Sequence, residues 1–280
     1  IIKILYIIFG SKIKINISLL IKNIKYIINK ITKLFIIVNK ITFIIPCYNC
    51  ESYIIDSYNK LRNEIKKFKI KYEIIFVDDG SKDKTFNILN NLKKKNRLVK
   101  ILRNKKNSGK SFSVIKGINK STNSKIVLID CDLPYLSSLK KIIFYLKKNV
   151  DLIIVNRKLK DSKMINKNLS FYQLIRYLIG ALIAFINLRF LKIKIVGGDT
   201  QAGLKGFIKI KNFNKIKFIS KKFFFDLELV HLYSLRKLKI VSVKCNYNIP
   251  KQSSIKIFDM KKNLFILKEL FKIIYNYSKV

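Results

Sequence analysis

The sequence predicts an α/β protein built on a mostly parallel sheet, and three observations support this prediction. From Ile41 onward, short apolar runs alternate with stretches of helical periodicity, which is the rhythm of βαβ units. The runs are rich in Ile and Val without polar alternation, as in strands that are buried on both faces. Several runs end in polar residues, and sheets of this kind bind ligands at the carboxyl ends of their strands.

Each expected element is placed by its own stretch of sequence. The Ile- and Val-rich runs predict strands over 41–46, 72–79, 98–104, 125–132 and 152–157. Helical spacing predicts helices over 52–68, after Asp83, after Gly109 and over 169–190. The section 197–247 is expected to form a turn, a strand, a helix and a further strand.

Both ends of the chain are predicted to be amphipathic. Residues 1–40 contain no acidic residue, and from Ile17 apolar side chains recur at helical spacing with lysines opposite them. Because lysines interrupt this segment too often for a transmembrane helix, we interpret it either as an interfacial helix on anionic lipid or as a helix packed on its own domain. We therefore expect a basic amphipathic segment over 1–40, the sheet domain over 41–257 and an amphipathic helix over 258–280.

The chain is strongly basic, but its charge says little about a partner. Its 280 residues include 59 Lys and Arg against 16 Asp and Glu, a formal net charge of +43, and 49% of them are hydrophobic. The hydrophobic share excludes a disordered polypeptide, and Lys, Ile and Asn are spread through every segment. We expect no nucleic-acid partner, because no basic face is segregated and aspartates gather at the predicted strand ends.

Four cysteines are too few and too scattered for the disulfide framework of a small secreted domain, which favours a reducing compartment. Cys47 and Cys50 form a C-x-x-C motif. No second pair and no nearby histidine complete a zinc set, since His231 stands far downstream. We therefore interpret the motif as structural.

Asp130 and Asp132 at the end of the 125–132 run are the most informative residues. Residues i and i+2 of a strand project to the same side, so both carboxylates can converge on one hard cation. Mg²⁺ or Mn²⁺ uses one or two carboxylates together with substrate phosphates, so a diphosphate ligand fits. The alternative, in which the two aspartates cap the following helix, stays open.

Two further segments predict a nucleotide-binding edge. Asp78 and Asp79 end a strand before a Gly80 turn, and one of these carboxylates is expected to remain free for a nucleoside base or ribose. The segment NSGKS at 107–111 lacks the glycine spacing of a Walker loop. We expect it to be a turn into a helix whose N-terminal amides and Lys110 face the cleft.

Four motifs then occur in a fixed order, namely FIIPCYN (43–49), FVDDGSKDKT (76–85), NSGKSFSVIKGI (107–118) and LIDCDLPY (128–135). Together they resemble the family 2 glycosyltransferases, and the match runs from Ile41 to about Ile257. The resemblance implies the GT-A fold, a three-layer α/β/α Rossmann-like nucleotide-diphospho-sugar transferase fold. Arg157, the helix around Arg176 and DTQAGLKGF (199–207) are similar to the branch that transfers sugar to a polyprenyl phosphate, the dolichyl-phosphate glucosyl- and mannosyltransferases and their bacterial relatives.

This resemblance implies an inverting hexosyltransferase that uses a UDP- or GDP-linked sugar and acts peripherally at the cytoplasmic face of a membrane with an anionic surface. It implies Mg²⁺ or Mn²⁺ on Asp130 and Asp132, and an acceptor phosphate that meets Arg157 and Arg176. Gln201 is implied to lie near the donor sugar or its diphosphate. The implied nucleotide-binding residues are Pro46, Tyr48, Glu51, Asp78, Asp79 and Lys110.

Two kinds of acceptor remain possible. A phosphate monoester is largely dianionic at neutral pH, since its second pKa is about 6, and it needs no general base. A sugar hydroxyl on a cell-surface or lipid-linked glycan needs a carboxylate base, and Asp199 is the candidate. The chain departs from the family pattern at Cys50, where an acidic residue is usual, and at Pro134-Tyr135. These departures bear on the identity of the donor more than on the fold.

Overall fold

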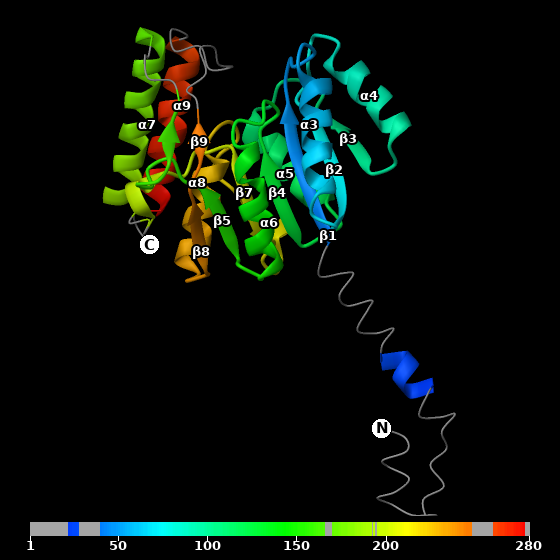
Figure 1. Cartoon of the computed structure of the whole chain (residues 1–280). Helices are drawn as coiled ribbons and strands as arrows, with labels where there is room; N and C mark the ends of the chain where they lie inside the picture. The colour runs from blue at the N-terminus through cyan, green and yellow to red at the C-terminus, as the bar shows by residue number, and fades with distance from the viewer. Residues whose placement is uncertain are drawn as a thin grey trace, which may run out of the picture. The chain divides into compact units, whose positions relative to one another are not determined.

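The computed structural model describes residues 22–27, 40–165, 170–191, 193, 195–247 and 260–277 (Figure 1). The chain divides into two compact units, 1–39 and 40–280, and each is described by itself. In the first unit, residues 22–27 form a helix with exposed side chains. The remainder of the helix expected from Ile17 lies outside the described residues. The second unit contains the sheet.

Among the residues that the structure describes, one large sheet of seven strands has the order β3-β2-β1-β4-β7-β5-β8. Neighbouring strands run parallel except at β7, which is antiparallel to both β4 and β5. The predicted α/β class with a mostly parallel sheet is therefore confirmed. The strands are β1 (Lys40–Cys47), β2 (Lys71–Asp78), β3 (Val99–Arg103), β4 (Lys125–Ile129), β5 (Leu152–Val155), β7 (Leu204–Ile208) and β8 (Ile240–Val243).

Helices cover both faces of this sheet. In β1, Phe43 and Ile45 belong to one buried apolar cluster and Ile44 belongs to a second one, because successive strand residues project to opposite faces. The first cluster includes side chains of α3 (Ile54–Lys66), α4 (Thr85–Lys95) and α6 (Leu139–Lys147). The second includes side chains of α5 (Lys110–Lys120) and α8 (Phe225–Leu235). The predicted three-layer α/β/α arrangement is confirmed.

The C-terminal helix α9 (Met260–Tyr277) belongs to the second unit and packs on its core. Its Leu270 and Ile273 are buried in the second apolar cluster. The carboxylate of Glu269 accepts hydrogen bonds of 2.6 to 3.0 Å from the backbone N–H groups of residues 221, 222 and 223. This helix therefore fixes the loop that precedes α8.

The reversed strand β7 returns the chain to the carboxyl end of β4. Ile129, the last residue of β4, pairs with Leu204, the first residue of β7. One step further, the backbone N–H of Asp130 donates to the carbonyl of Gly203 at 2.9 Å. Residues that precede β7 are thus held beside residues that follow β4.

Helix α7 (Phe171–Arg189) matches the helix predicted over 169–190 and starts at a capping box, in which Ser170 and Gln173 bond each other's backbone N–H. Beside it in Figure 1 is a short parallel ladder of β6 (Lys163–Met164) and β9 (Asn246–Tyr247). In the described part of the chain, no helix combines the length and the hydrophobicity needed to cross a bilayer.

Helix α6 was not predicted from the sequence. Its signal was present, because Leu139, Ile142, Ile143 and Leu146 recur at helical spacing and all are buried. Lysines lie between these apolar residues and make the helical spacing harder to recognise, as they do along much of this basic chain.

Candidate active site

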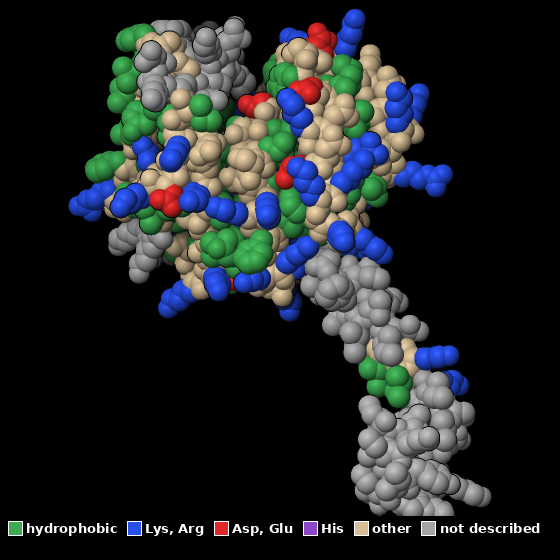
Figure 2. Space-filling model, in the orientation of Figure 1, with side chains coloured by type: hydrophobic (Ala, Val, Ile, Leu, Met, Phe, Trp, Pro, Cys, Tyr) green, Lys and Arg blue, Asp and Glu red, His purple; other side chains and the backbone are tan. Residues whose placement is uncertain are grey.

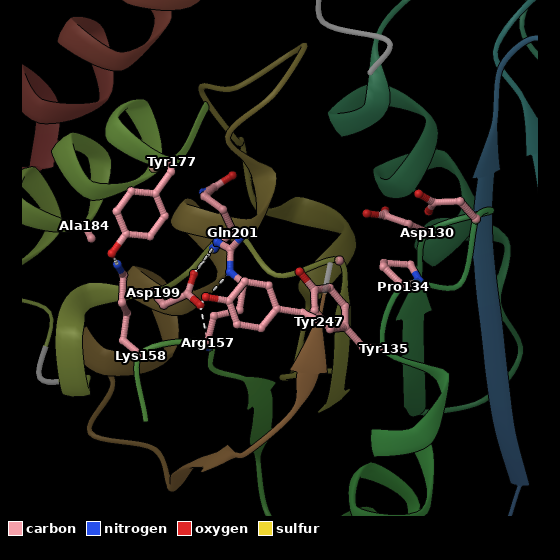
Figure 3. Close-up of a pocket in the computed structure, with 13 residues that line it drawn as sticks. Asp130, Pro134, Tyr135, Arg157, Lys158, Tyr177, Ala184, Asp199, Gln201 and Tyr247 are labelled. Carbon is pink, nitrogen blue, oxygen red and sulfur yellow. Dashed lines mark hydrogen bonds and ion pairs between the residues drawn. The ribbon is translucent and has the colours of Figure 1, made fainter. Parts of the chain in front are cut away.

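A pocket opens at the edge of the sheet where β4 ends and β7 begins (Figure 3). It brings together five of the residues that the sequence analysis selected, which are Asp130, Asp132, Arg157, Asp199 and Gln201. Pro134, Tyr135, Lys158, Tyr177, Gly180, Ala184, Gly203 and Tyr247 complete its lining. In Figure 3 Asp130 lies on one side, and Arg157 and Asp199 lie on the other.

The two aspartates of the D-x-D motif lie in a turn and not in a strand. β4 ends at Ile129, and Leu133 takes a left-handed conformation with a φ of 52°. The argument from strand alternation was therefore wrong, although both residues do line the same pocket. The turn, fixed by the hydrogen bond from Asp130 to Gly203, brings them there.

Gly203 is required by this close approach. A Cβ atom added at this position would lie 1.8 Å from Oδ2 of Asp130, far inside van der Waals contact. Any side chain at position 203 must displace the first carboxylate of the motif. The absence of a side chain at position 203 therefore allows Asp130 to keep its place in the pocket.

Asp130 is part of a line of alternating charges that continues into the core. Lys110 Nζ lies 2.6 Å from Asp130 Oδ1 and 3.6 Å from Asp226 Oδ2, and Asp226 Oδ1 lies 2.6 Å from Lys205 Nζ. Burial alone would lower the pKa of Lys110, but the carboxylates of Asp130 and Asp226 outweigh it and raise that pKa. For Lys205 burial prevails and lowers the pKa.

On the other side of the pocket, Arg157 holds Asp199 by two parallel bonds. Arg157 Nε donates to Oδ2 at 2.9 Å and a terminal nitrogen donates to Oδ1 at 2.7 Å, while the backbone N–H of Arg157 donates to Oδ2 at 2.7 Å. Burial of Asp199 acts to raise its pKa, but the guanidinium outweighs burial and the pKa is lowered. Asp199 is therefore a poor proton acceptor.

Gln201 and the tyrosines shape the space between these two sides. The Gln201 side-chain amide donates to Thr200 Oγ1 at 3.2 Å, and Thr200 also accepts from Asn187 of α7 at 3.0 Å. Tyr135 is buried, and burial raises its pKa to about 12. It therefore stays neutral, as a hydroxyl that can donate or accept a hydrogen bond.

Asp78 and Asp79 lie outside the pocket lining and act within the protein. Asp79 accepts hydrogen bonds from Asn104 Nδ2, Ser108 N–H and Gly109 N–H, at 2.7 to 2.8 Å. Asp78 is fully buried, accepts from Ser81 N–H and lies 3.1 Å from Arg103 Nε. The expectation that one of these carboxylates remains free was wrong, because both are used to fix neighbouring loops.

The loop after β1 interlocks with the Gly80 turn. Asn49 Oδ1 accepts from Lys82 N–H at 2.9 Å, and Glu51 Oε2 accepts from Lys84 N–H at 2.7 Å. Tyr48 is partly exposed beside them, and Pro46 is the second-last residue of β1. The end of β1 and the loop after it thus contain Pro46, Tyr48 and Glu51 close together. None of these three residues lines the pocket.

The N-terminus of α5 is closed by the protein itself. The backbone N–H groups of Ser111 and Phe112 donate to the carbonyls of Lys222 and Lys221, each at 3.1 Å. The expectation that these amides face the cleft was therefore wrong, whereas the Lys110 side chain does reach Asp130. The loop that accepts these bonds is the one fixed by Glu269 of α9.

Arg176 lies in α7, but its side chain lies outside the described part of the chain, so its predicted contact stays a prediction. Helix α7 contributes Tyr177, Gly180 and Ala184 to the pocket instead. Sequence reasoning missed Lys158, which follows Arg157, and Asp226 with Lys205. Asp226 carried a signal, because an acidic residue inside FFFDLELV interrupts an apolar run and must find a buried partner.

A mostly parallel α/β sheet with an acidic turn at its edge is the arrangement expected of a glycosyltransferase with the GT-A fold. Residues 42–205 match the model of glycosyl transferase family 2, and the chain belongs to this family. The family resemblance inferred from the motifs is thereby confirmed.

Curated relatives include dolichyl-phosphate sugar transferases. The chain is 27% identical over 192 residues to the dolichyl-phosphate beta-glucosyltransferase of Dictyostelium discoideum, covering 65% of this chain and 57% of that protein. It is 33% identical over 105 residues to the dolichol-phosphate mannosyltransferase of Pyrococcus furiosus, covering 37% of this chain and 29% of that protein. The chain thus spans between about a third and somewhat over half of these relatives' lengths.

Solved structures of low sequence identity share the fold. Glucosyl-3-phosphoglycerate synthase of Mycobacterium tuberculosis in complex with UDP superimposes with a TM-score of 0.58 at 12% identity, covering 86% of this chain and 81% of that one. A mannosyltransferase of Pyrobaculum calidifontis in complex with GDP-Man and Mn²⁺ gives a TM-score of 0.51 at 14% identity, covering 84% and 64%.

Proposed function

We propose that the protein is an inverting transferase that moves a hexose from a UDP- or GDP-linked sugar to a polyprenyl phosphate, peripherally at the cytoplasmic face of a membrane. Family membership supports the reaction class, and the dolichyl-phosphate transferases among its relatives support the acceptor. All four cysteines are free thiols, in keeping with a reducing compartment.

The engagement of Asp199 is the observation that most favours a phosphate acceptor. A hydroxyl acceptor must lose a proton, and Asp199 is the carboxylate that the sequence analysis selected to take it. Both of its oxygens are bound by Arg157, and its pKa is lowered. A phosphate dianion brings its own negative oxygen, so it reacts without such a base.

Two cations beside Asp199 suit that acceptor. A guanidinium has five N–H donors, and Arg157 uses two of them on Asp199. We assign the others to the acceptor phosphate, together with the ammonium of Lys158, which also lines the pocket. Arg176, one turn of α7 before Gly180, stays a proposed third contact.

Asp130 and Asp132 fit a hard divalent cation. Both line the pocket and offer oxygen ligands, although Asp130 would share its carboxylate with the ammonium of Lys110. Mg²⁺ or Mn²⁺ bound here would neutralise charge on the departing diphosphate. We assign Lys110 the same electrostatic task, since its raised pKa keeps it protonated.

We place the nucleotide against the interlocked loops of the first two strands. Tyr48 offers a partly exposed ring for the base, and Pro46 and Glu51 flank it in the sequence. Asp78 and Asp79 act as positioning residues in this proposal, because they hold the Gly80 turn and the 104–109 loop. Gln201 is assigned to the sugar or its diphosphate from its place in the pocket.

In the proposed reaction, one oxygen of the acceptor phosphate attacks the anomeric carbon from the face opposite the diphosphate. The new carbon–oxygen bond uses an electron pair of the phosphate, and the bond to the diphosphate breaks with its pair leaving on the diphosphate. No proton is transferred. Arg157 and Lys158 orient the acceptor and Lys110 faces the leaving group, so catalysis rests on positioning and electrostatics.

Membrane attachment is supported by the outer surface of α7. Leu174, Leu178, Leu182 and Phe185 recur at helical spacing and are 44 to 58% exposed. Hydrophobic side chains gather along the edge of the molecule where this helix lies, whereas Lys and Arg are spread over the visible face (Figure 2). An exposed apolar patch of this kind marks a lipid or partner surface.

The proposal is tested with purified protein, a panel of UDP- and GDP-sugars and short polyprenyl phosphates, with and without EDTA. We expect a glycosyl phosphate that mild acid releases, identified by mass spectrometry, and loss of turnover in EDTA that added Mg²⁺ or Mn²⁺ restores. An acid-stable glycoside on a glycan hydroxyl, with no product on the lipid phosphate, would contradict the proposed acceptor while leaving the family intact.

A further inference from the structure

Three of the four cysteines meet directly beneath the acidic turn. Cys47 is the last residue of β1, Cys50 lies in the loop that follows, and Cys131 lies between Asp130 and Asp132. Their sulfur atoms all lie within 4.8 Å of one another, and the side chains are 2%, 1% and 7% exposed. We call these three residues the thiol cluster.

The sulfur positions match those of a thiolate metal site. Two sulfurs that each lie about 2.3 Å from a tetrahedral zinc ion are about 3.8 Å apart. Cys47 Sγ and Cys131 Sγ are 3.7 Å apart, and Cys50 closes the triangle. A disulfide would bring two sulfurs to about 2.0 Å, and none of the three residues forms one.

The chain provides this arrangement from two places in the sequence. Cys47 and Cys50 have the spacing with which zinc-binding loops present two ligands, and Cys131 joins them from 84 residues beyond Cys47. The sequence contains no second closely spaced pair of cysteines. The third sulfur comes instead from the turn that follows the adjacent parallel strand, because β1 pairs with β4 and the segments after both strands leave the same edge of the sheet.

We propose that the thiol cluster binds one thiophilic metal ion, Zn²⁺ or Cu⁺, and thereby ties the end of β1 to the turn that carries Asp130 and Asp132. Sulfur ligands select these soft ions, whereas the carboxylate oxygens of the turn suit Mg²⁺ or Mn²⁺. The two sites are therefore chemically separate although they share the turn. This proposal does not depend on the transferase reaction.

The test uses the full chain, reduced and freed of metal, titrated with Cd²⁺ as a spectroscopic substitute. Cd²⁺ on sulfur gives an ultraviolet charge-transfer band that Cd²⁺ on carboxylate lacks. We expect a band that saturates at one equivalent and disappears when Zn²⁺ or Cu⁺ competes, and the more effective competitor identifies the preferred ion. A protein that develops no such band would overturn the proposal.

Matched variants locate the ligands. Cys47→Ser, Cys50→Ser and Cys131→Ser should each weaken the binding that gives the band at least about tenfold, because each removes one sulfur ligand. Cys245→Ser is the control, since Cys245 is equally buried but lies outside the cluster, and it should bind as the wild type does. A band of unchanged strength and affinity in Cys131→Ser contradicts the proposed site.

Two further measurements keep the proposal falsifiable if a serine variant fails to fold. The Asp130→Asn/Asp132→Asn double variant should retain the Cd²⁺ band, which separates the sulfur site from the oxygen site. X-ray absorption of the zinc-loaded wild type should give sulfur neighbours at about 2.3 Å. A spectrum with only oxygen and nitrogen neighbours rules out the thiol cluster as the zinc site.

Discussion

Lys110 Nζ lies 2.6 Å from Asp130 Oδ1, so the first carboxylate of the acidic turn already has a cation beside it. The same ammonium lies 3.6 Å from the buried Asp226. A divalent ion that binds Asp130 must therefore share this carboxylate with Lys110. Because Asp226 offers the ammonium a second partner, Lys110 need not leave the core when a metal arrives.

This arrangement predicts opposite effects of Lys110→Met on metal binding and on turnover. Removing the ammonium leaves Asp130 without its competing cation, so Mn²⁺ should bind about tenfold more tightly. Turnover should fall, because a cation that faces the leaving diphosphate is lost. Mn²⁺ affinity by calorimetry and kcat at saturating metal measure the two effects separately.

Lys120→Met is the control for that substitution, since Lys120 ends the same helix and is exposed. It should leave both quantities unchanged. If Lys110→Met weakens Mn²⁺ binding, then Lys110 supports the metal site and does not compete with it, and the account given above is wrong.

Gly203→Ala should disable the site without disturbing the sheet. The added Cβ would lie 1.8 Å from Asp130 Oδ2, so the carboxylate must move. A displacement of about 1 Å in a catalytic group costs roughly a hundredfold in rate, and we expect at least that loss in kcat/KM together with weaker Mn²⁺ binding.

Gly180→Ala gives a matched comparison for Gly203→Ala. Gly180 also lines the pocket, but a Cβ there meets nothing within 4 Å. Because alanine favours a helix over glycine, this variant should gain about 0.5–1 kcal/mol of unfolding free energy and keep its activity. Equal activity losses in the two variants would mean that the close approach to Asp130 is not what matters at position 203.

The layers of the fold were predictable from sequence, because buried parallel strands are continuous runs of Ile and Val. The ends of such runs are also visible in the sequence, because polar residues follow them. This placed Asp130 and Asp132 at the carboxyl-terminal edge of the sheet. The turn that orients them was not predictable. It depends on the hydrogen bond from Asp130 to Gly203, and only the reversed course of β7 brings those residues together.

Asp78 and Asp79 illustrate a second limit of sequence reasoning. A carboxylate at the end of a strand can accept hydrogen bonds from a ligand or from a neighbouring loop. The sequence alone does not show which of these donors binds it in the folded protein. Here Ser108 and Gly109, about thirty residues further on, donate their backbone N–H groups to Asp79. Long-range backbone partners of this kind leave no local pattern in the chain.

Asp199→Asn should destabilise the protein in a pH-dependent way. Arg157 lowers the pKa of Asp199 in the folded state. The ion pair therefore stabilises the fold fully when the pH is above the pKa of the unfolded carboxyl group, about 3.9. This stabilisation is lost as the pH falls through the lower pKa of the folded state. The amide should cost on the order of 2–4 kcal/mol at pH 7, since it leaves a largely buried guanidinium without its countercharge. Below about pH 4 the difference from wild type should shrink.

Urea unfolding at several pH values measures that difference, and Asp161→Asn provides the comparison. Asp161 pairs with Lys244 at 3.1 Å, but both side chains are more than half exposed, at 67% and 51%. Its loss should cost less than about 1 kcal/mol at any pH. A cost for Asp199→Asn that stays constant from pH 7 to pH 3 would mean that the charge of Asp199 is not what stabilises the fold.

The pH dependence of turnover distinguishes the two kinds of acceptor. With a polyprenyl phosphate, kcat/KM should rise with a pKa of about 6, because the acceptor becomes a dianion there. The lowered pKa of Asp199 places its own titration well below this region. The rise should therefore persist in Asp199→Asn at reduced amplitude, and its disappearance would assign the titration to a protein carboxylate acting as a base.

The exposed apolar side of α7 predicts which surface meets the membrane. Leu182 is 55% exposed, and it lies outside the pocket lining, unlike Tyr177, Gly180 and Ala184 on the same helix. Burying one leucine in lipid contributes about 1.5–3 kcal/mol, so Leu182→Glu should weaken partitioning onto anionic vesicles at least about tenfold. Turnover of a short, water-soluble acceptor should stay at the wild-type level.

Phe144→Glu on α6 is the matched control for Leu182→Glu, because Phe144 is 49% exposed and lies on the helix layer of the other apolar cluster. Both substitutions add the same charge, so electrostatic repulsion from anionic lipid affects them equally, and only insertion of α7 distinguishes them. Vesicle flotation at low and at high salt makes the comparison. If both variants float as the wild type does, lipid does not cover this side of α7; if both are lost equally, attraction of the basic surface and not insertion of α7 holds the protein on the membrane.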